Sequence, residues 1–273
     1  MPAEGNSHYI HGSEPWEQDR LSKLNVLLNE RCLRELQLQG GEHIIDVGSG
    51  LGQFSRLMAN QGCKVTAIER DSAQISTALH LAQAANEAHL VDFRNGNALE
   101  LPLQAEEWGQ YDIAHTRFVL EHVPQPIRII EQMLKALRPG GRIILADDDH
   151  STFIVTPEPP GFSEIWQAYM RSYDRLGNDP YIGRRLVSLL HSAGAKPVYN
   201  TLVFFGGCAG DPLFSVVAEN LIGILEGARK LILQEELLSA MLFDKAIAGL
   251  HDWKMMPDAA LWYGMYWAEG VRV

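Results

Sequence analysis

Basic residues and cysteines are both scarce in this 273-residue sequence, and each shortage excludes a class of protein. Lys and Arg number 23 against 34 Asp and Glu, so the formal charge at pH 7 is −11. Binding of nucleic-acid phosphates needs clustered Lys and Arg, so we expect no nucleic-acid partner. The three cysteines, Cys32, Cys63 and Cys208, are widely spaced without a C-x-x-C pair, which argues against a disulfide framework or a zinc ribbon.

No uninterrupted apolar run is long enough to cross a membrane. The most apolar stretch, 213–233, is broken by Glu219, Glu226 and Arg229 and predicts an amphipathic helix. The first 20 residues have no basic start followed by an apolar core, so they predict neither a signal peptide nor a transit peptide. We expect a cytoplasmic, globular protein without a membrane partner.

Strand and helix patterns alternate between residues 43 and 146. Apolar runs predict strands at 43–47, 64–69, 91–94, 111–115 and 142–146, and the segments between them predict helices at 53–61, 72–87 and 125–137. Such repeated β and α elements indicate an α/β protein with a parallel sheet and helices on both of its faces.

Helical patterns on either side of this region predict a cap. Residues 15–38 predict a helix within an N-terminal cap segment, 1–40. Cap insertions are expected at about 151–180 and 207–257. The predicted late elements are helices at 157–176, 183–193, 212–230 and 234–250, and strands at 198–205 and 261–273.

The glycine-rich turn Asp46-Val47-Gly48-Ser49-Gly50-Leu51-Gly52 lies where the first predicted strand ends and a helix begins. Its glycines permit positive φ angles and a close approach of the backbone to a ligand. Amides at the start of the following helix point outward, and Asp46 adds a carboxylate at the end of the strand. These features predict a ligand-binding turn.

One hypothesis is that this turn belongs to a nicotinamide-dependent oxidoreductase. Its fingerprint is G-x-G-x-x-G, followed about 20 residues later by an acidic residue that binds ribose. Glu69 meets the second condition, but Gln53 stands where the third glycine should be. The negative charge of Asp46 would also repel a pyrophosphate, whereas it suits a ligand that carries an ammonium and a sulfonium.

Residues 43–147 resemble the class I S-adenosylmethionine-dependent methyltransferases that act on small molecules. Five segments carry the resemblance, in the family's order: IIDVGSGLG (44–52), VTAIERD (65–71), GNALELP (96–102), YDIAHTRFVLEHVPQP (111–126) and LRPGGRIIL (137–145). The resemblance implies a Rossmann-like domain at 41–273. Its seven-stranded, mostly parallel sheet would have an antiparallel last strand, helices on both faces and a helical cap.

The resemblance also implies S-adenosyl-L-methionine as cofactor and a site for it. Glu69 would bind both ribose hydroxyls, Asp46 would lie near the amino group, and His115 would lie beside the methionine moiety. Asn97 stands where the family more often has an acidic residue, and it is either an adenine contact or only a turn residue. The candidate cofactor residues are Tyr9, Asp46, Gly48, Ser49, Gly50, Gly52, Glu69, Arg70, Asn97, Ala98, Leu99 and His115.

The acceptor side is less defined by the sequence. His122 is a candidate general base, or an ordinary buried histidine. Trp166, Tyr169 and Tyr173 share a helical face and form either an aromatic wall of the substrate pocket or core packing. The run Asp147-Asp148-Asp149-His150 suggests magnesium ligands, but we expect a solvated cluster at the acceptor mouth and no metal.

These expectations define one function and two alternatives. The function is methyl transfer to an O, N or C nucleophile of a small, hydrophobic or aromatic metabolite. The alternatives are the NAD(P)-dependent oxidoreductase and a noncatalytic S-adenosylmethionine-binding regulatory protein. The apolar late helices either pair two chains into a homodimer or pack only within their own chain.

Overall fold

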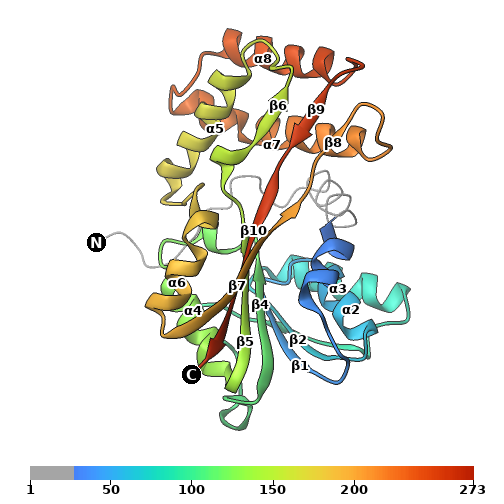
Figure 1. The fold of residues 1–273 in the computed structure, drawn as a ribbon, viewed down its shortest axis with the longest axis vertical. Coiled ribbons are helices and arrows are strands. Elements are labelled where there is room, and N and C mark those ends of the chain that lie inside the picture. Colours follow the sequence, from blue (N-terminus) through green and yellow to red (C-terminus); the bar gives the residue numbers. More distant parts are fainter. Residues whose placement is uncertain (1–27) are drawn as a thin grey trace.

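The computed structural model describes residues 28–273, and its centre is a seven-stranded sheet (Figure 1). The strand order is β3-β2-β1-β4-β5-β10-β7, in which β10 alone runs in the direction opposite to the other strands. The strands are β1 (His43–Val47), β2 (Lys64–Glu69), β3 (Val91–Asn95), β4 (Tyr111–Arg117), β5 (Leu137–Asp147), β7 (Ala195–Phe204) and β10 (Gly264–Arg272). The predicted fold class, with an antiparallel last strand, is confirmed.

Alternate residues of the strands face two separate hydrophobic cores. In β1, Ile44 belongs to one core and its neighbour Ile45 to the other, as the two-residue period of a strand requires. Phe54 and Met58 of α2 pack in the first core, and Ile130 of α4 packs in the second. The sheet helices are α2 (Gln53–Asn60), α3 (Ser72–Ala84), α4 (Pro126–Ala136) and α6 (Leu186–Ser192).

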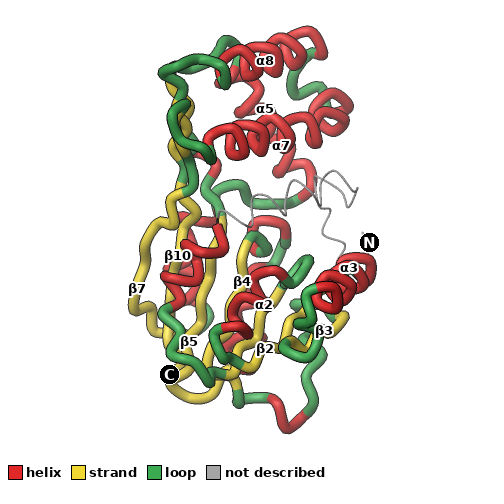
Figure 2. The backbone as a smooth tube through the Cα atoms, turned by 90° about the vertical axis from the view of Figure 1, so that its right-hand side faces the viewer, coloured by secondary structure: helices red, strands yellow, loops and turns green. Residues whose placement is uncertain are grey.

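A helical cap lies beyond one end of the sheet (Figure 2). It consists of α5 (Phe162–Leu176), α7 (Phe214–Gln234) and α8 (Ala240–Trp253), which contact one another, and a small antiparallel sheet. The small sheet has the order β6-β9-β8, with β6 (Ile154–Thr156), β8 (Gly207–Cys208) and β9 (Ala260–Trp262). The first hydrophobic core continues into the cap, where it includes Phe243 and Trp253.

Several elements differ from their predicted bounds. The single strand expected at 261–273 is divided at Tyr263 into β9 of the cap and β10 of the main sheet. The helix expected at 183–193 begins as a short 3-10 turn, Ile182–Arg185, before α6. Of the helix expected at 15–38, residues 28–36 are helical, and the remainder of that prediction lies mostly outside the described residues.

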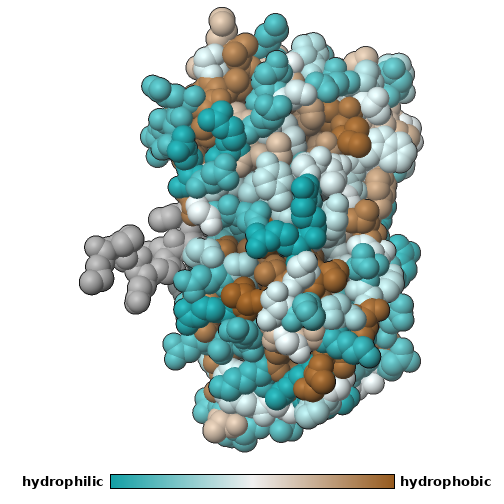
Figure 3. All heavy atoms as spheres, turned by 60° about the vertical axis from the view of Figure 1, so that its left-hand side comes forward, coloured by the Kyte–Doolittle hydropathy of each residue, from teal (hydrophilic) through white to brown (hydrophobic). Residues whose placement is uncertain are grey.

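The surface drawn in Figure 3 carries apolar residues in separate patches among hydrophilic ones. In the described part of the chain, no helix combines the length and the apolar character that a membrane span requires.

Candidate functional site

The glycine-rich turn has a backbone that only glycine fits at two positions. Gly48 has φ +78°, and a Cβ atom added there would lie 2.3 Å from Cγ2 of Val119. Gly52 has φ +67°, and its added Cβ atom would lie 2.3 Å from the Phe93 ring. The amides of Gly48 and Ser49 donate to the carbonyl of Ile68 at 2.8 and 3.0 Å, which ties the turn to the end of β2.

This turn borders a pocket of about 370 Å³ at the ends of β1, β2 and β4, within the range of small-molecule sites. Eleven predicted site residues contribute to its lining: Asp46, Gly48, Ser49, Gly50, Glu69, Arg70, Asn97, Ala98, Leu99, His115 and His122. Gly52 is not part of the lining, since it packs against Phe93 at the start of α2. Tyr9 lies outside the described residues.

Glu69 lies at the end of β2 with both carboxylate oxygens hydrogen-bonded to backbone amides. Oε2 accepts from the amide of Gly50 at 3.1 Å, and Oε1 accepts from the amide of Asp71 at 2.9 Å. Each oxygen retains a further lone pair, because a carboxylate has about four acceptor positions. Glu69 is therefore fixed in orientation and can still accept hydrogen bonds from a ligand.

Asp46 is buried at the end of β1 and held by two side chains. Its Oδ1 lies 2.8 Å from Nδ1 of His115, and its Oδ2 accepts from the hydroxyl of Ser55 at 2.5 Å. Burial alone would raise the pKa of Asp46, but the hydrogen bonds from the His115 ring and the Ser55 hydroxyl, together with the nearby Arg117, outweigh it, so the pKa is lowered. The buried Nε2 of His115 makes no hydrogen bond within the described residues, and it is available to a ligand.

Asn97 has a local structural contact as well as a place in the pocket. Its Oδ1 accepts from the amide of Leu99 at 3.0 Å, which is the geometry of an Asx turn. The predicted turn role is therefore present, and Asn97, Ala98 and Leu99 still border the pocket.

Sequence reasoning missed several residues of this site. Arg117 at the end of β4 lines the pocket, lies 4.7 Å above the ring of Phe54 and donates to Oδ1 of Asn29 at 2.9 Å. Val119 lines the pocket and faces Gly48. The position of Arg117 directly after a buried parallel strand was an available signal, because ligands bind at the carboxyl ends of such strands.

His122 lines the pocket from the short 3-10 turn Leu120–His122 that follows β4. Its Nε2 lies 3.3 Å from Oε1 of Glu121. Burial lowers the pKa of His122 to about 3, and the nearby His150 and Arg70 act in the same direction. The ring is therefore neutral at pH 7, as a proton acceptor must be, and its low pKa makes it a weak base.

Trp166, Tyr169 and Tyr173 of α5 are buried and do not line the pocket. Their rings surround His150 at centroid distances of 5.6, 5.5 and 5.2 Å. Tyr173 also stacks near His122, with ring centroids 6.0 Å apart. In this structure the three aromatic side chains form the surroundings of a buried histidine.

The run Asp147 to His150 after β5 is buried, so the expectation of a solvated cluster is wrong. Asp147 accepts from the amides of Leu120 and Asp148 at 2.8 and 3.0 Å, and Asp149 pairs with Arg184. The aromatic side chains of α5 and Tyr263 cover His150. These four polar residues are therefore shielded from water.

Burial also changes the protonation of this region. It raises the pKa of Asp147 and of Asp148 well above the usual range. Burial raises the pKa of Glu121 to about 8, and the charge of Asp179 adds to the shift. Burial lowers the pKa of His150. The side chains that follow β4 and β5 thus lie in surroundings that disfavour charge.

The methyltransferase-domain family matches residues 20–200, which is more than half of the chain. The chain therefore belongs to the methyltransferase-domain family. This match and the fold confirm the class I resemblance drawn from the five sequence segments.

Two curated relatives show how far the similarity extends. The ubiquinone biosynthesis O-methyltransferase of Stutzerimonas stutzeri (strain A1501) is 33% identical over 131 residues, which are 48% of this chain and 52% of that protein. The 27-O-demethylrifamycin SV methyltransferase of Amycolatopsis mediterranei (strain S699) is 30% identical over 152 residues, 55% and 53% of the two chains. The chain thus spans about half the length of these relatives.

Solved structures share the fold over almost the whole chain at low identity. The [4+2]-cyclase SpnF has a TM-score of 0.54 at 20% identity, covering 98% of this chain and 84% of that one. Geranyl diphosphate C-methyltransferase from Streptomyces coelicolor A3(2) has a TM-score of 0.55 at 14% identity, covering 98% and 90%. These likenesses extend the shared fold into the cap.

Proposed function

We propose that this protein transfers a methyl group from S-adenosylmethionine to an O, N or C nucleophile of a small, hydrophobic or aromatic molecule. The observation that carries the proposal is the pocket at the ends of β1, β2 and β4, where Asp46, Glu69 and His115 converge beside the glycine-rich turn. Membership of the methyltransferase-domain family supports it.

The polar groups of the pocket suit the two ends of this cofactor. The ribose hydroxyls donate to the oxygens of Glu69, which the amides of Gly50 and Asp71 hold in place. The ammonium of the methionine part would lie near Asp46 and would donate to Nε2 of His115. Ala98 and Leu99 border the adenine ring.

Methyl transfer from a sulfonium is an in-line displacement, so alignment and the exclusion of water supply much of the rate. S-adenosylmethionine would supply the methyl group from its S–CH3 bond to the acceptor and leave as S-adenosylhomocysteine. His122, which lines the same pocket, takes the proton that the acceptor loses. The ring is held against Glu121, which makes Glu121 a positioning residue.

The acceptor class is drawn from the names of the relatives. They are methyltransferases named for ubiquinone biosynthesis, for demethylrifamycin SV and, in Listeria welshimeri at 26% identity, for demethylmenaquinone. All are small-molecule methyltransferases, and the acidic charge of this chain disfavours an anionic polymer as acceptor.

One comparison favours a second candidate function. SpnF, which shares the fold over 98% of this chain, is named as a [4+2]-cyclase and not as a methyltransferase. A protein of this fold that binds S-adenosylmethionine without transferring its methyl group is therefore the second candidate. It includes the noncatalytic regulatory protein expected as an alternative from the sequence.

Calorimetric titration of the purified protein with S-adenosylmethionine and, separately, with NADH tests the proposal. We expect binding of S-adenosylmethionine alone. Incubation with a panel of quinols, phenols and aromatic amines should then yield a product heavier by one CH2 unit in mass spectrometry. Cofactor binding without any product would favour the second candidate, and binding of NADH alone would establish the oxidoreductase. Light scattering of the same sample tests the homodimer.

A further inference from the structure

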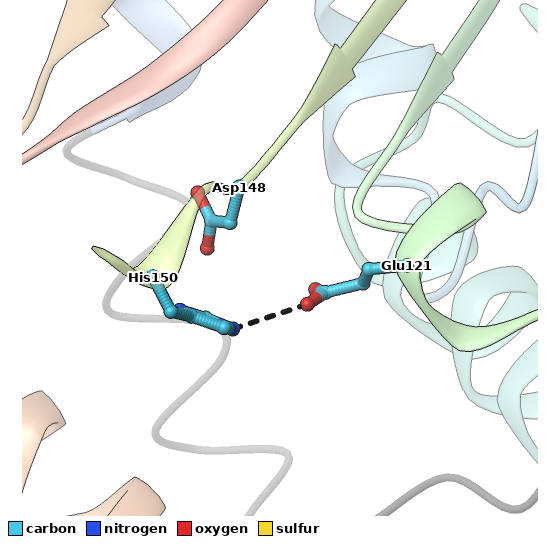
Figure 4. Close-up of side chains that lie close together, drawn as sticks. All are labelled: Glu121, Asp148 and His150. Carbon is cyan, nitrogen blue, oxygen red and sulfur yellow. Dashed lines mark hydrogen bonds and ion pairs between the residues drawn. The ribbon is translucent and has the colours of Figure 1, made fainter. Parts of the chain in front are cut away.

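Three buried side chains from two strand ends meet outside the lining of the pocket. Glu121 follows β4, whereas Asp148 and His150 follow β5. One ligand atom from each lies within 4.8 Å of the other two. In Figure 4, Glu121 and Asp148 approach the ring of His150 from different elements. We propose that these three side chains bind a divalent first-row transition-metal ion.

The charge of the cluster is the first argument for a cation. In the described part of the chain, Glu121 lies 3.3 and 3.2 Å from ring nitrogens of His122 and His150, and neither Glu121 nor Asp148 pairs with a Lys or Arg there. The Oδ1 atom of Asp148 is buried without a hydrogen-bond partner, and the carboxylate points toward the space beside His150 (Figure 4). Burial of these carboxyl groups without a cationic partner disfavours their charged form, and a bound cation would remove that penalty.

The distances also suit a metal ion. Nε2 of His150 lies 3.2 Å from Oε2 of Glu121, close to the separation of about 3.0 Å between neighbouring ligands of an octahedral ion with bonds of about 2.1 Å. A triangle with sides of 4.8 Å, the upper bound for the three ligand atoms, has its centre about 2.8 Å from each corner. Side-chain movements of under about 1 Å would reach metal-ligand distances.

Outer contacts fix His150 in the orientation of a ligand. Its Nδ1 lies 3.0 Å from the hydroxyl of Tyr263, and that hydroxyl also forms a hydrogen bond with Asp148. A metal-bound histidine typically donates its second ring N–H to an oxygen in this way. With Nδ1 bonded to Tyr263, Nε2 presents its lone pair toward Glu121. The hydroxyl of Tyr173, 3.1 Å from the same Nε2, would then bond to Glu121.

The ligand set indicates which ions fit. One imidazole with two carboxylates suits Mn2+, Fe2+ or Zn2+ better than Ca2+, which prefers oxygen ligands alone. The outer tyrosines come from α5 and from the junction of β9 and β10. A bound ion would therefore join the main sheet to the cap and fix Glu121 beside His122. The proposal does not depend on methyl transfer.

Metal analysis and thermal unfolding test the site on the full chain. The protein is stripped with a chelator, dialysed against Mn2+ or Zn2+ and analysed by mass spectrometry for bound metal. We expect one ion per chain with micromolar affinity, and a melting temperature about 5 °C higher at an excess of metal. Asp148→Asn should weaken binding at least about 10-fold. Asp258→Asn removes the same charge from an exposed position and should change nothing.

Two outcomes would overturn the site. One is stripped wild-type protein that takes up neither ion and shows no shift in melting temperature. The other is equal binding by Asp148→Asn and Asp258→Asn. If Asp148→Asn does not fold, Glu121→Gln replaces it with the same expected loss. Binding that survives in the Glu121 variant would equally contradict the proposal.

Discussion

The carboxylates at the ends of β1 and β2 differ from those that follow β4 and β5. Asp46 and Glu69 have fixed partners, a histidine and a hydroxyl in one case and two backbone amides in the other, and both line a pocket. Glu121 and Asp148 are equally buried, but they adjoin a histidine and tyrosines and do not line that pocket. Neighbouring strand ends of one sheet thus hold partnered carboxylates that line a pocket in one place and buried carboxyl groups in surroundings that disfavour charge in the other.

The difference indicates that acidic residues at one edge of the sheet have two separate roles. The partnered acids are preorganised to accept hydrogen bonds from a cofactor. Glu121, which follows β4, contacts His122, and His122 lines the pocket. Substitutions on the two sides should therefore change different measured quantities, which variants of His122 and Glu69 test.

The largest effect is expected for His122→Asn. Loss of a general base lowers kcat by between about 100-fold and 10,000-fold, whereas the affinity for S-adenosylmethionine should stay within about twofold, since the cofactor contacts lie on the other side. Single-turnover rates and calorimetry measure the two quantities. Unchanged turnover would show that the acceptor needs no base.

Gly48→Ala should have the next largest effect. The added Cβ meets Val119 at 2.3 Å in a residue with φ +78°, so strain and overpacking together cost about 2 to 5 kcal/mol. Gly177→Ala is the matched control, because Gly177 has φ +72° with no atom within 4 Å. It should cost about 1 to 2 kcal/mol. Urea unfolding measures the loss of unfolding free energy in both variants. Equal losses would show that the close approach to Val119 contributes nothing.

Glu69→Ala should change cofactor affinity and leave the fold intact. Removal of charge-assisted hydrogen bonds to the ribose should weaken S-adenosylmethionine binding about 10- to 100-fold. Glu106→Ala removes the same charge at an exposed position and should bind like wild type. Calorimetry with unaltered affinity in the Glu69 variant would refute the ribose assignment.

The smallest effect concerns an acid that has an arginine partner and partial exposure. Hydrogen bonds from Arg94 lower the pKa of Glu107 from 4.5 to about 2. Because the folded-state pKa is lowered, the stabilisation is present above about pH 4.5 and is lost as the pH falls toward 2. Glu107→Gln should therefore lower stability by no more than about 1 kcal/mol at pH 7. The two proteins should converge near pH 2 in thermal unfolding, and a gap that persists there would contradict the assignment.

The part of the fold that was predictable is the part with strong local periodicity. The strands at 43–47 and 64–69 appear with the expected bounds, because apolar runs end at glycines or charged residues there. The small cap sheet was not predicted, since β6 has three residues and β8 two, which is too short for a period to show.

The candidate site divides in the same way. The turn residues and Glu69 share one sequence motif, so their convergence could be anticipated. Ser55 and Val119 reach the site through tertiary contacts that no local pattern records. The burial of Asp148 and His150 was missed for the same reason, since the covering tyrosines are distant in sequence.

The division of the last strand region at Tyr263 links the cap directly to the main sheet, because β9 and β10 are consecutive in the chain. The chain reaches β10 only after leaving β9, and β10 lies between β5 and β7 in the main sheet. β7 pairs with β10 alone among the described strands. A chain shortened before residue 260 would lose the central member of that trio and leave β7 without a hydrogen-bonding neighbour. The outer part of the main sheet can therefore form only after residues 264–272 have been synthesised.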